Sequence, residues 1–348
     1  MSKDGNRGPE SGDWGPRTEN REPRTENREP RTESRGFIPR SLDPRRMETT
    51  RIVQVDAFTD EPLAGNPAGV VPDADDLSTE QMQAIADEMA VSETAFLRSS
   101  DAGDRRIRYF TPAQEVDLCG HATIGSFAYL RERDGLESGT TTLETNVGVL
   151  EIELDEDGTV WMTQEPPRIR EVELSYDRVA DALGVDAAAL EGASDDIPLA
   201  VSSTGLPFLI VPITYLSDLG SAEPDMNAIE TLTESVDAAG VYLFTFDALE
   251  RESTLHGRMF APGAGVPEDP VTGTASGAAG AYLDRFGAFD DDFPDELRLE
   301  QGHYVDRPGT VRVRVGDREG VRVGGRGVVA LEGTLVVPED DEDDILEA

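Results

Sequence analysis

The sequence predicts an α+β fold of two similar lobes, related by a pseudo-twofold axis and facing each other across a cleft. The first observation is an internal repeat, because residues 108–130 return in modified form as residues 258–283. In each copy a strand-like run ends in a loop with proline, and a glycine then opens a helix of small residues ending in Ala-Tyr-Leu. The second observation is that strands and helices follow in the same order before each copy. A chance similarity of two Ala- and Gly-rich helices is the alternative.

The elements of the first lobe follow from alternation and capping. Alternating or β-rich runs predict strands at residues 51–58, 65–71, 91–97, 140–154 and 159–163, the last two as a hairpin across the turn at 155–158. The pattern of residues 78–89 is helical, with Ser78 as N-cap and Gln81 as its capping-box partner. The glycine that opens the repeat's helix is Gly120.

The second lobe is expected to begin after the Pro-containing linker at residues 164–168. The boundaries are therefore 47–165 for the N-terminal lobe and 166–337 for the C-terminal lobe. Residues 203–211 match 65–71, with glycine and proline spaced alike before a strand. Further strands are expected at residues 240–246, 254–260, 311–315, 321–323 and 327–337, and helices at residues 178–183 and 226–239. The equivalent of Gly120 is Gly273, and the close packing of its helix against a sheet would explain Gly277 and Gly280 inside it.

Both ends of the chain are expected to lie outside the lobes. Residues 1–46 repeat Arg-Thr-Glu-Asn-Arg-Glu-Pro, which has no apolar residue to form a coiled-coil seam, so this segment is predicted to be a disordered tail. Met47 stands directly before the first strand pattern, and we expect it to be the true start, or the tail to be dispensable. Residues 338–348 form an acidic tail.

The composition restricts the partners. The formal net charge is −40, from 31 Lys and Arg against 71 Asp and Glu. Nucleic acids and anionic membranes are bound through basic patches, so neither is an expected partner. Such an acidic excess is typical of halophilic proteins, whose repulsion is screened by molar salt; an acidic protein working in ordinary salt is the alternative. No apolar run is long enough for a membrane helix, and we expect a cytoplasmic protein.

Missing residue types restrict the chemistry further. Lys3 is the only lysine, so Schiff-base and pyridoxal-phosphate enzymes lack their nucleophile. Cys119 is the only cysteine, which excludes disulfides, thiolate-rich zinc sites and a racemase with two thiols. The starts of the two repeat helices, at Gly120 and Gly273, present unpaired N–H groups that together could bind a carboxylate.

Five ordered motifs between residues 51 and 337 resemble the PhzF-like isomerases of phenazine biosynthesis. They are Val-Asp-Ala-Phe-Thr-Asp-Glu-Pro-Leu-Ala-Gly-Asn-Pro at 55–67, Ser-Glu-Thr-Ala-Phe at 92–96, Arg-Tyr-Phe-Thr-Pro at 108–112, Asp-Leu-Cys-Gly-His-Ala-Thr at 117–123 and Glu-Asp-Pro-Val-Thr-Gly at 268–273. The resemblance implies the diaminopimelate-epimerase fold, in which each lobe is a curved sheet around a central helix and the active site lies in the cleft between the lobes. It also implies a homodimer and neither cofactor nor metal.

The resemblance also assigns roles to residues. The principal acid/base glutamate of the family falls on Glu93, and its Gly-His and Glu-Asp-Pro motifs place His121 and Asp269 in the site. Gly120, Gly273 and Thr274 are then expected to contact the substrate. Thr274 stands where the family usually has serine, which keeps the hydroxyl but adds a methyl group that could narrow the pocket.

Each assignment has a structural alternative. Glu93 could occupy an exposed strand edge, and His121 could be a histidine satisfied within the fold. Asp269 could serve only to place a negative charge at a helix start. Cys119 fits packing better than catalysis.

The expected function is a cofactor-independent isomerase that shifts a proton on a small carboxylate-bearing metabolite. A non-catalytic binder of small acids and an amino- or imino-acid epimerase are the alternatives, and fold alone would not choose among them. Glu93 distinguishes the isomerase from the binder, because a binder needs the helix starts but has no use for an acid/base carboxylate between apolar neighbours.

Overall fold

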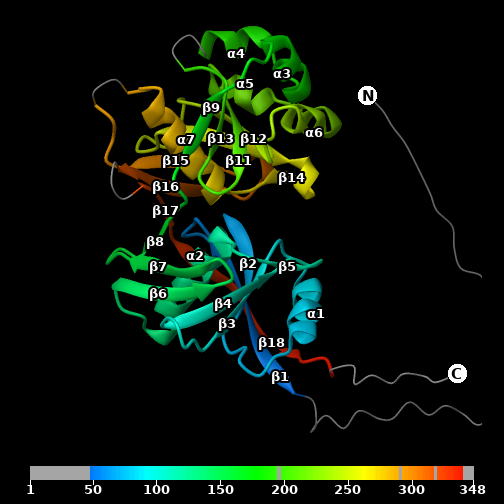
Figure 1. Ribbon diagram of the computed structural model, residues 1–348, viewed down its shortest axis with the longest axis vertical. Helices are drawn as coiled ribbons and strands as arrows, with labels where there is room; N and C mark the ends of the chain where they lie inside the picture. Colours follow the sequence, from blue (N-terminus) through cyan, green and yellow to red (C-terminus); the bar gives the residue numbers. More distant parts are fainter. Residues whose placement is uncertain (1–47, 194–196, 290–291, 317–319, 340–348) are drawn as a thin grey trace, which may run out of the picture. The chain divides into compact units, whose positions relative to one another are not determined.

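The computed structural model describes residues 48–193, 197–289, 292–316 and 320–339. The predicted tail at 1–46, the start at Met47 and residues 340–348 lie outside the described residues. The described strands all belong to one hydrogen-bonded sheet system, which is built twice in the same order (Figure 1).

The first half of the sheet pairs its strands in the order β18-β1-β2-β3-β4-β6-β7-β8, with β5 also on β4. Its strands are β1 (Thr49–Ala57), β2 (Asn66–Val71), β3 (Thr94–Arg98), β4 (Arg105–Phe110), β5 (Glu115–Val116), β6 (Gly139–Thr145), β7 (Gly148–Leu154), β8 (Val160–Thr163) and β18 (Gly327–Val336). The pairs β2–β3 and β4–β6 are parallel, and the others are antiparallel.

The second half repeats this order as β9-β10-β11-β12-β13-β15-β16-β17, with β14 also on β13. Its strands are β9 (Arg168–Glu171), β10 (Ala200–Ser203), β11 (Pro207–Pro212), β12 (Gly240–Thr245), β13 (Leu255–Ala261), β14 (Val266–Asp269), β15 (Leu297–Gln301), β16 (Gly309–Gly316) and β17 (Gly320–Gly325). The parallel pairs, β11–β12 and β13–β15, fall at the equivalent places. Antiparallel pairing of β8 with β17 joins the halves.

The helices include one central helix for each half. The α-helices are α1 (Thr79–Met89), α2 (Gly120–Asp134), α3 (Tyr176–Leu183), α4 (Ala187–Ala193), α5 (Leu216–Ser221), α6 (Met226–Glu234) and α7 (Gly273–Arg285), and the 3-10 helices are η1 (Pro262–Ala264) and η2 (His303–Val305). The central helices α2 and α7 are buried without interruption over residues 122–130 and 275–283. None of the described helices combines the length and apolar character needed to cross a bilayer.

The sheets wrap these helices closely. Helix α2 packs on β1, β2 and β18, and α7 packs on β10, β16 and β17. A Cβ atom added at Gly280 would lie 2.6 Å from Val313 Cγ1, and one at Gly277 would lie 2.9 Å from Val323 Cγ2. Close packing therefore explains these glycines, as the sequence predicted.

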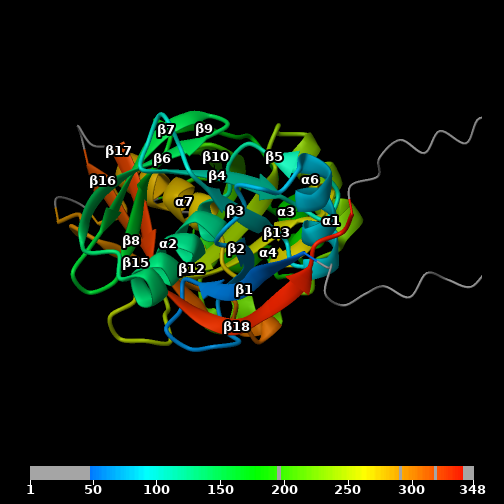
Figure 2. The same ribbon diagram turned by 90° about the horizontal axis from the view of Figure 1, so that it is seen from below.

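The last strand, β18, returns to the first half. It pairs with β1 from Thr49↔Val336 to Ala57↔Gly327, and Figure 2 shows the two strands side by side. Residues 327–336, which the sequence placed in the C-terminal lobe, therefore hydrogen-bond into the sheet of the N-terminal one. The division of the chain at residue 165 stays a prediction.

Two expectations need correction. The single strand expected at residues 140–154 is two strands, β6 and β7, because the chain turns at Asn146-Val147 before Gly148, whose φ is +123°. The helix expected at residues 226–239 ends at Glu234, where Ser235 is the C-cap. The capping box of Ser78 and Gln81 is confirmed.

Candidate active site

Glu93 lies directly before β3, which is paired on both sides, with β2 and with β4. Its side chain is 23% exposed, so it is not at an open sheet edge. The Oε2 atom is buried and has no hydrogen-bond partner among the described residues. Buried carboxylate oxygens are normally hydrogen-bonded, so this atom is an exception among the described residues that calls for an explanation.

His121, in the first turn of α2, lies close to that oxygen. Its Nε2 lies 3.4 Å from Glu93 Oε2 and 3.3 Å from Ser92 Oγ, and its side chain is 12% exposed. On the other side of the ring, Nδ1 lies 3.4 Å from Cys119 Sγ. The structure therefore brings together Glu93 and His121, which are separated in the sequence by the strands β3, β4 and β5.

Cys119 is the N-cap of α2 and is buried. Burial, reinforced by the nearby carboxylate of Glu93, holds the pKa of the Cys119 thiol well above its ordinary value. A thiol in this state is a weak nucleophile, which agrees with a packing role.

Asp269, at the end of β14, approaches the same place from the second half of the chain. It accepts hydrogen bonds from Asn66 Nδ2 at 3.0 Å and from Thr272 Oγ1. Burial raises the pKa of Asp269, the Thr272 hydrogen bond and the His121 ring oppose that rise, and the charge of Glu93 adds to it. Asp269, Glu93 and His121 are therefore electrostatically coupled across the two halves.

Both central helices begin beside this cluster. The N-cap residues Cys119 and Thr272 make no side-chain capping hydrogen bond, and α2 and α7 contact each other. Gly120 is open around its Cα, whereas a Cβ at Gly273 would lie 2.9 Å from Phe58 Cζ. Two helix starts next to a carboxylate–imidazole pair can hold an anion and transfer a proton.

Thr274 lies in the first turn of α7 and is half-buried. Its carbonyl oxygen accepts from Thr204 Oγ1 at 3.3 Å, and its methyl group would lie 3.7 Å from a Cβ at Gly205. The added methyl group thus sits against the turn before β11.

Sequence reasoning missed the residues that hold Asp269. Asn66 donates both to Asp269 and to the Val271 carbonyl at 2.8 Å, and Gln301 Nε2 donates to the Asp269 carbonyl at 2.8 Å. The only signal for Asn66 was its place in the Gly-Asn-Pro motif at 65–67.

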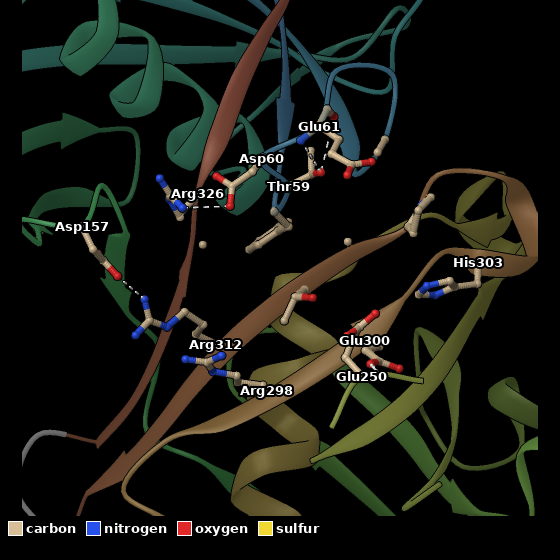
Figure 3. A pocket seen from close by; sticks show the side chains of 16 residues that line it. Thr59, Asp60, Glu61, Asp157, Glu250, Arg298, Glu300, His303, Arg312 and Arg326 are labelled. Carbon is tan, nitrogen blue, oxygen red and sulfur yellow. Dashed lines mark hydrogen bonds and ion pairs between the residues drawn. The ribbon is translucent and has the colours of Figure 1, made fainter. Parts of the chain in front are cut away.

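None of the predicted site residues lines a separate cavity of about 480 Å³ (Figure 3). Most of the charged side chains that line it form ion pairs, such as Arg326 with Asp60 and Arg312 with Asp157, both at 2.8 Å. The glutamate–histidine cluster is the better candidate for the active site, because it lies beside the starts of both central helices.

Comparison with known proteins agrees with the fold described above. The phenazine biosynthesis-like protein family matches residues 55–333. The "Uncharacterized isomerase YfhB" of Bacillus subtilis (strain 168) is 37% identical over 298 residues, 84% of this chain and 98% of that protein. The "Trans-2,3-dihydro-3-hydroxyanthranilate isomerase" of Pseudomonas chlororaphis is 33% identical over 297 residues, 82% of this chain and 99% of that protein.

Solved structures give the same result. The Bacillus anthracis phenazine biosynthesis protein of the PhzF family superposes with a TM-score of 0.76 at 35% identity, covering 84% of this chain and all of that one. A hydroxyproline epimerase from Agrobacterium vitis shares the fold alone, with a TM-score of 0.52 at 13% identity over 84% of this chain and 94% of that one. The repeated fold and the family match over residues 55–333 lead to one conclusion: the chain belongs to the phenazine biosynthesis-like (PhzF-like) family of isomerases.

Proposed function

We propose that the protein moves a proton within a small carboxylate-bearing metabolite, without a cofactor, and that Glu93 carries the proton. The observation that supports this most directly is the buried Oε2 of Glu93, which has no hydrogen-bond partner among the described residues, lies 3.4 Å from His121 Nε2 and belongs to a carboxylate that interacts electrostatically with Asp269. A protein that only bound its ligand would have no need of this arrangement.

The chemistry follows from these positions. Glu93 takes a proton from a substrate carbon, so the C–H bond breaks and its electron pair moves into the adjoining unsaturated system. Protonated Glu93 then returns the proton to another carbon of the same molecule, so the substrate and product have the same atoms. His121 and Asp269 orient or polarise the substrate.

The two helix starts supply the anion site. The N–H groups at Gly120 and Gly273 would bind the substrate carboxylate and stabilise the negative charge that develops as the proton leaves. The name of the Pseudomonas chlororaphis relative contains such a compound, a dihydrohydroxyanthranilate. That carboxylate is the first substrate to test. The choice does not require that the pathway of the present protein leads to a phenazine.

The test measures turnover and deuterium incorporation in D₂O, for the wild type and for Glu93→Gln. We expect deuterium in the wild-type product, unless the carboxylate returns the same proton before exchange, and a rate about 10²–10⁴-fold lower in the variant. Glu80→Gln, which changes an exposed carboxylate in the first turn of α1, is the matched control and should keep the wild-type rate.

Three outcomes would count against the proposal. If Glu93→Gln turns over as fast as the wild type, Glu93 is not the proton carrier. If wild type binds carboxylates without turnover or exchange, the protein is a binder. If the product differs from the substrate only in the configuration at one carbon, the protein is an epimerase.

A further inference from the structure

The side chains of Glu93, Cys119 and His121 have the donor types and the spacing of a metal site. One ligand atom from each lies within 4.8 Å of the other two, and this is the only group of three or more His, Cys, Asp or Glu side chains of this kind found in the described residues. Cys119 Sγ lies 4.0 Å from His121 Nε2, which in turn lies 3.4 Å from Glu93 Oε2.

These distances can be compared with those of bound zinc. Zn–S bonds of about 2.3 Å and Zn–N and Zn–O bonds of about 2.0–2.2 Å, at tetrahedral angles, put neighbouring ligand atoms about 3.3–3.7 Å apart. Two of the three pairs, Glu93–His121 and Cys119–His121, are at or within a few tenths of an ångström of that spacing, and the third, Glu93–Cys119, is within 4.8 Å. Rotation of the Glu93 and Cys119 side chains toward each other would bring the three ligand atoms to tetrahedral spacing.

We propose that this cluster binds Zn²⁺ or a similar divalent cation through Glu93, Cys119 and His121, and that the bound ion inhibits the isomerase. Thiolate and imidazole are ligands that zinc prefers, and three protein ligands leave the fourth position to water. The ion would occupy the Glu93 lone pair that is otherwise free. Inhibition rests on the proposed function of Glu93, whereas the binding of the ion does not.

A nearby carboxylate adds negative charge that opposes the partial positive charge of the two helix starts. The carboxylate of Asp269 is close enough to interact electrostatically with Cys119 and His121. Asp269 itself is already held by Asn66 and Thr272, so it adds negative charge without being a necessary ligand. The ligand is the thiolate, so binding displaces the thiol proton of Cys119.

Cobalt substitution tests the site without any substrate. Titration of metal-free protein with Co²⁺ in molar KCl should give a thiolate-to-cobalt charge-transfer band, and Zn²⁺ should abolish it. The chain has one cysteine, so such a band can arise only from Cys119. The band should be absent in Cys119→Ser, and Glu93→Gln should weaken Co²⁺ binding at least ~10-fold, the lower end of the effect of outer-shell partners.

His303→Asn is the matched control, because it removes a half-buried histidine from another part of the fold and should leave the band unchanged. Circular dichroism of each variant shows whether it folds. A wild-type protein without the band, or equal Zn²⁺ affinity in wild type and Cys119→Ser by calorimetry, would overturn the proposed site.

An activity measurement separates this inference from the proposed function. Zn²⁺ should inhibit the wild type and spare Cys119→Ser, whose proton carrier is intact. An ion that binds without slowing the wild type would refute the inhibition while the site stands. A fully active Glu93→Gln would instead refute the proposed function, whatever the cobalt spectrum shows.

Discussion

The two copies of the internal repeat share one framework contact. In the first copy, Arg108 on β4 donates to both carboxylate oxygens of Glu115, each at 2.7 Å. In the second, Arg258 on β13 donates to both oxygens of Glu268, at 2.9 and 2.8 Å. In both, the pair spans the loop that leads to the central helix, so each copy fixes the start of its helix in the same way.

The central helices differ in how they pack. Helix α2 carries Ile124 and Phe127 at the positions where α7 carries Gly277 and Gly280. The large side chains of α2 fill the space inside its sheet, whereas the glycines of α7 let Val313 and Val323 approach the helix backbone. The same architecture is thus packed with different side chains at equivalent helix positions.

The chemistry is also unequal. The first copy supplies Cys119 and His121 at its helix start, and the second supplies Thr272 and Thr274 in their places. The second copy contributes the buried carboxylate of Asp269 instead. The two copies thus share the duplicated framework but contribute different side chains to the candidate site.

The largest expected effect comes from breaking the arginine pair of the second copy. Arg258→Met leaves Glu268 unpaired and also removes donors from the carbonyls of Leu219, at 3.1 Å, and Ala222, at 3.0 Å. The side chains of Arg258 and Glu268 are only 8% and 14% exposed. We expect the free energy of unfolding to fall by about 3–5 kcal/mol, measured by chemical denaturation.

Arg108→Met is the matched change in the first copy. Its pair is more exposed, at 13% and 28%, so a loss of roughly 1–3 kcal/mol is expected. Equal losses in both variants would show that the two pairs are energetically interchangeable and that burial does not distinguish them.

A smaller effect is expected from adding methyl groups to the two helices. The Cβ of Gly280→Ala would lie 2.6 Å from Val313 Cγ1, so the core must shift, at a cost of about 1–3 kcal/mol. In Gly120→Ala nothing lies within 4 Å of the new Cβ, so stability should be unchanged or higher by up to ~1 kcal/mol. Thermal or chemical unfolding of both variants measures the difference; a destabilised Gly120→Ala would contradict it.

The sequence predicted the features that depend on local pattern. The repeat, the capping box of Ser78 and the close packing at Gly277 and Gly280 all follow from residues near one another in the chain, and the structure confirms them. The prediction of one long strand at 140–154 was wrong, because the β-rich run continues through a turn that only Gly148 marks.

Features that depend on tertiary pairing could not be predicted in the same way. The pairing of β18 with β1 joins the two ends of the fold, and alternation gives no register for strands so far apart. The hydrogen bond from Asn66 to Asp269 links two motifs recognised separately. Resemblance placed Glu93 and His121 in the site, but only the folded chain shows them 3.4 Å apart with Cys119 beside them.

The smallest expected effect concerns an ion pair between two parallel strands, which are β4 and β6 in the first copy and β13 and β15 in the second. In the first copy, Arg106 on β4 pairs with Glu144 on β6 at 3.0 Å and is partly exposed. In the second, His256 on β13 contacts Glu300 on β15 at 2.9 Å, and both side chains are buried. The second copy has therefore replaced a permanently charged partner with a histidine.

This replacement predicts a pH dependence that belongs to the second copy. Burial alone would raise the pKa of Glu300, but hydrogen bonds from His256 and from the backbone N–H groups of Leu249 and Glu250 outweigh it and lower the pKa to about 2, against 4.5 ordinarily. A carboxyl group whose folded pKa lies below its unfolded pKa stabilises the fold above the unfolded value. That stability is lost as the pH falls from about 4.5 toward 2.

The measurement is the free energy of unfolding between pH 5 and pH 2.5, in high salt, for the wild type and for Glu300→Gln. The pKa of Asp157 is lowered to about 2 as well, because hydrogen bonds from Thr159 and Arg312 outweigh its burial, so part of the wild-type slope is its contribution. The share of Glu300 is the difference between the two proteins, which should narrow as the pH falls. If this difference stays constant across the range, the protonation of Glu300 does not change the stability of the fold. The His256–Glu300 contact would then differ from the arginine pair of the first copy in packing alone.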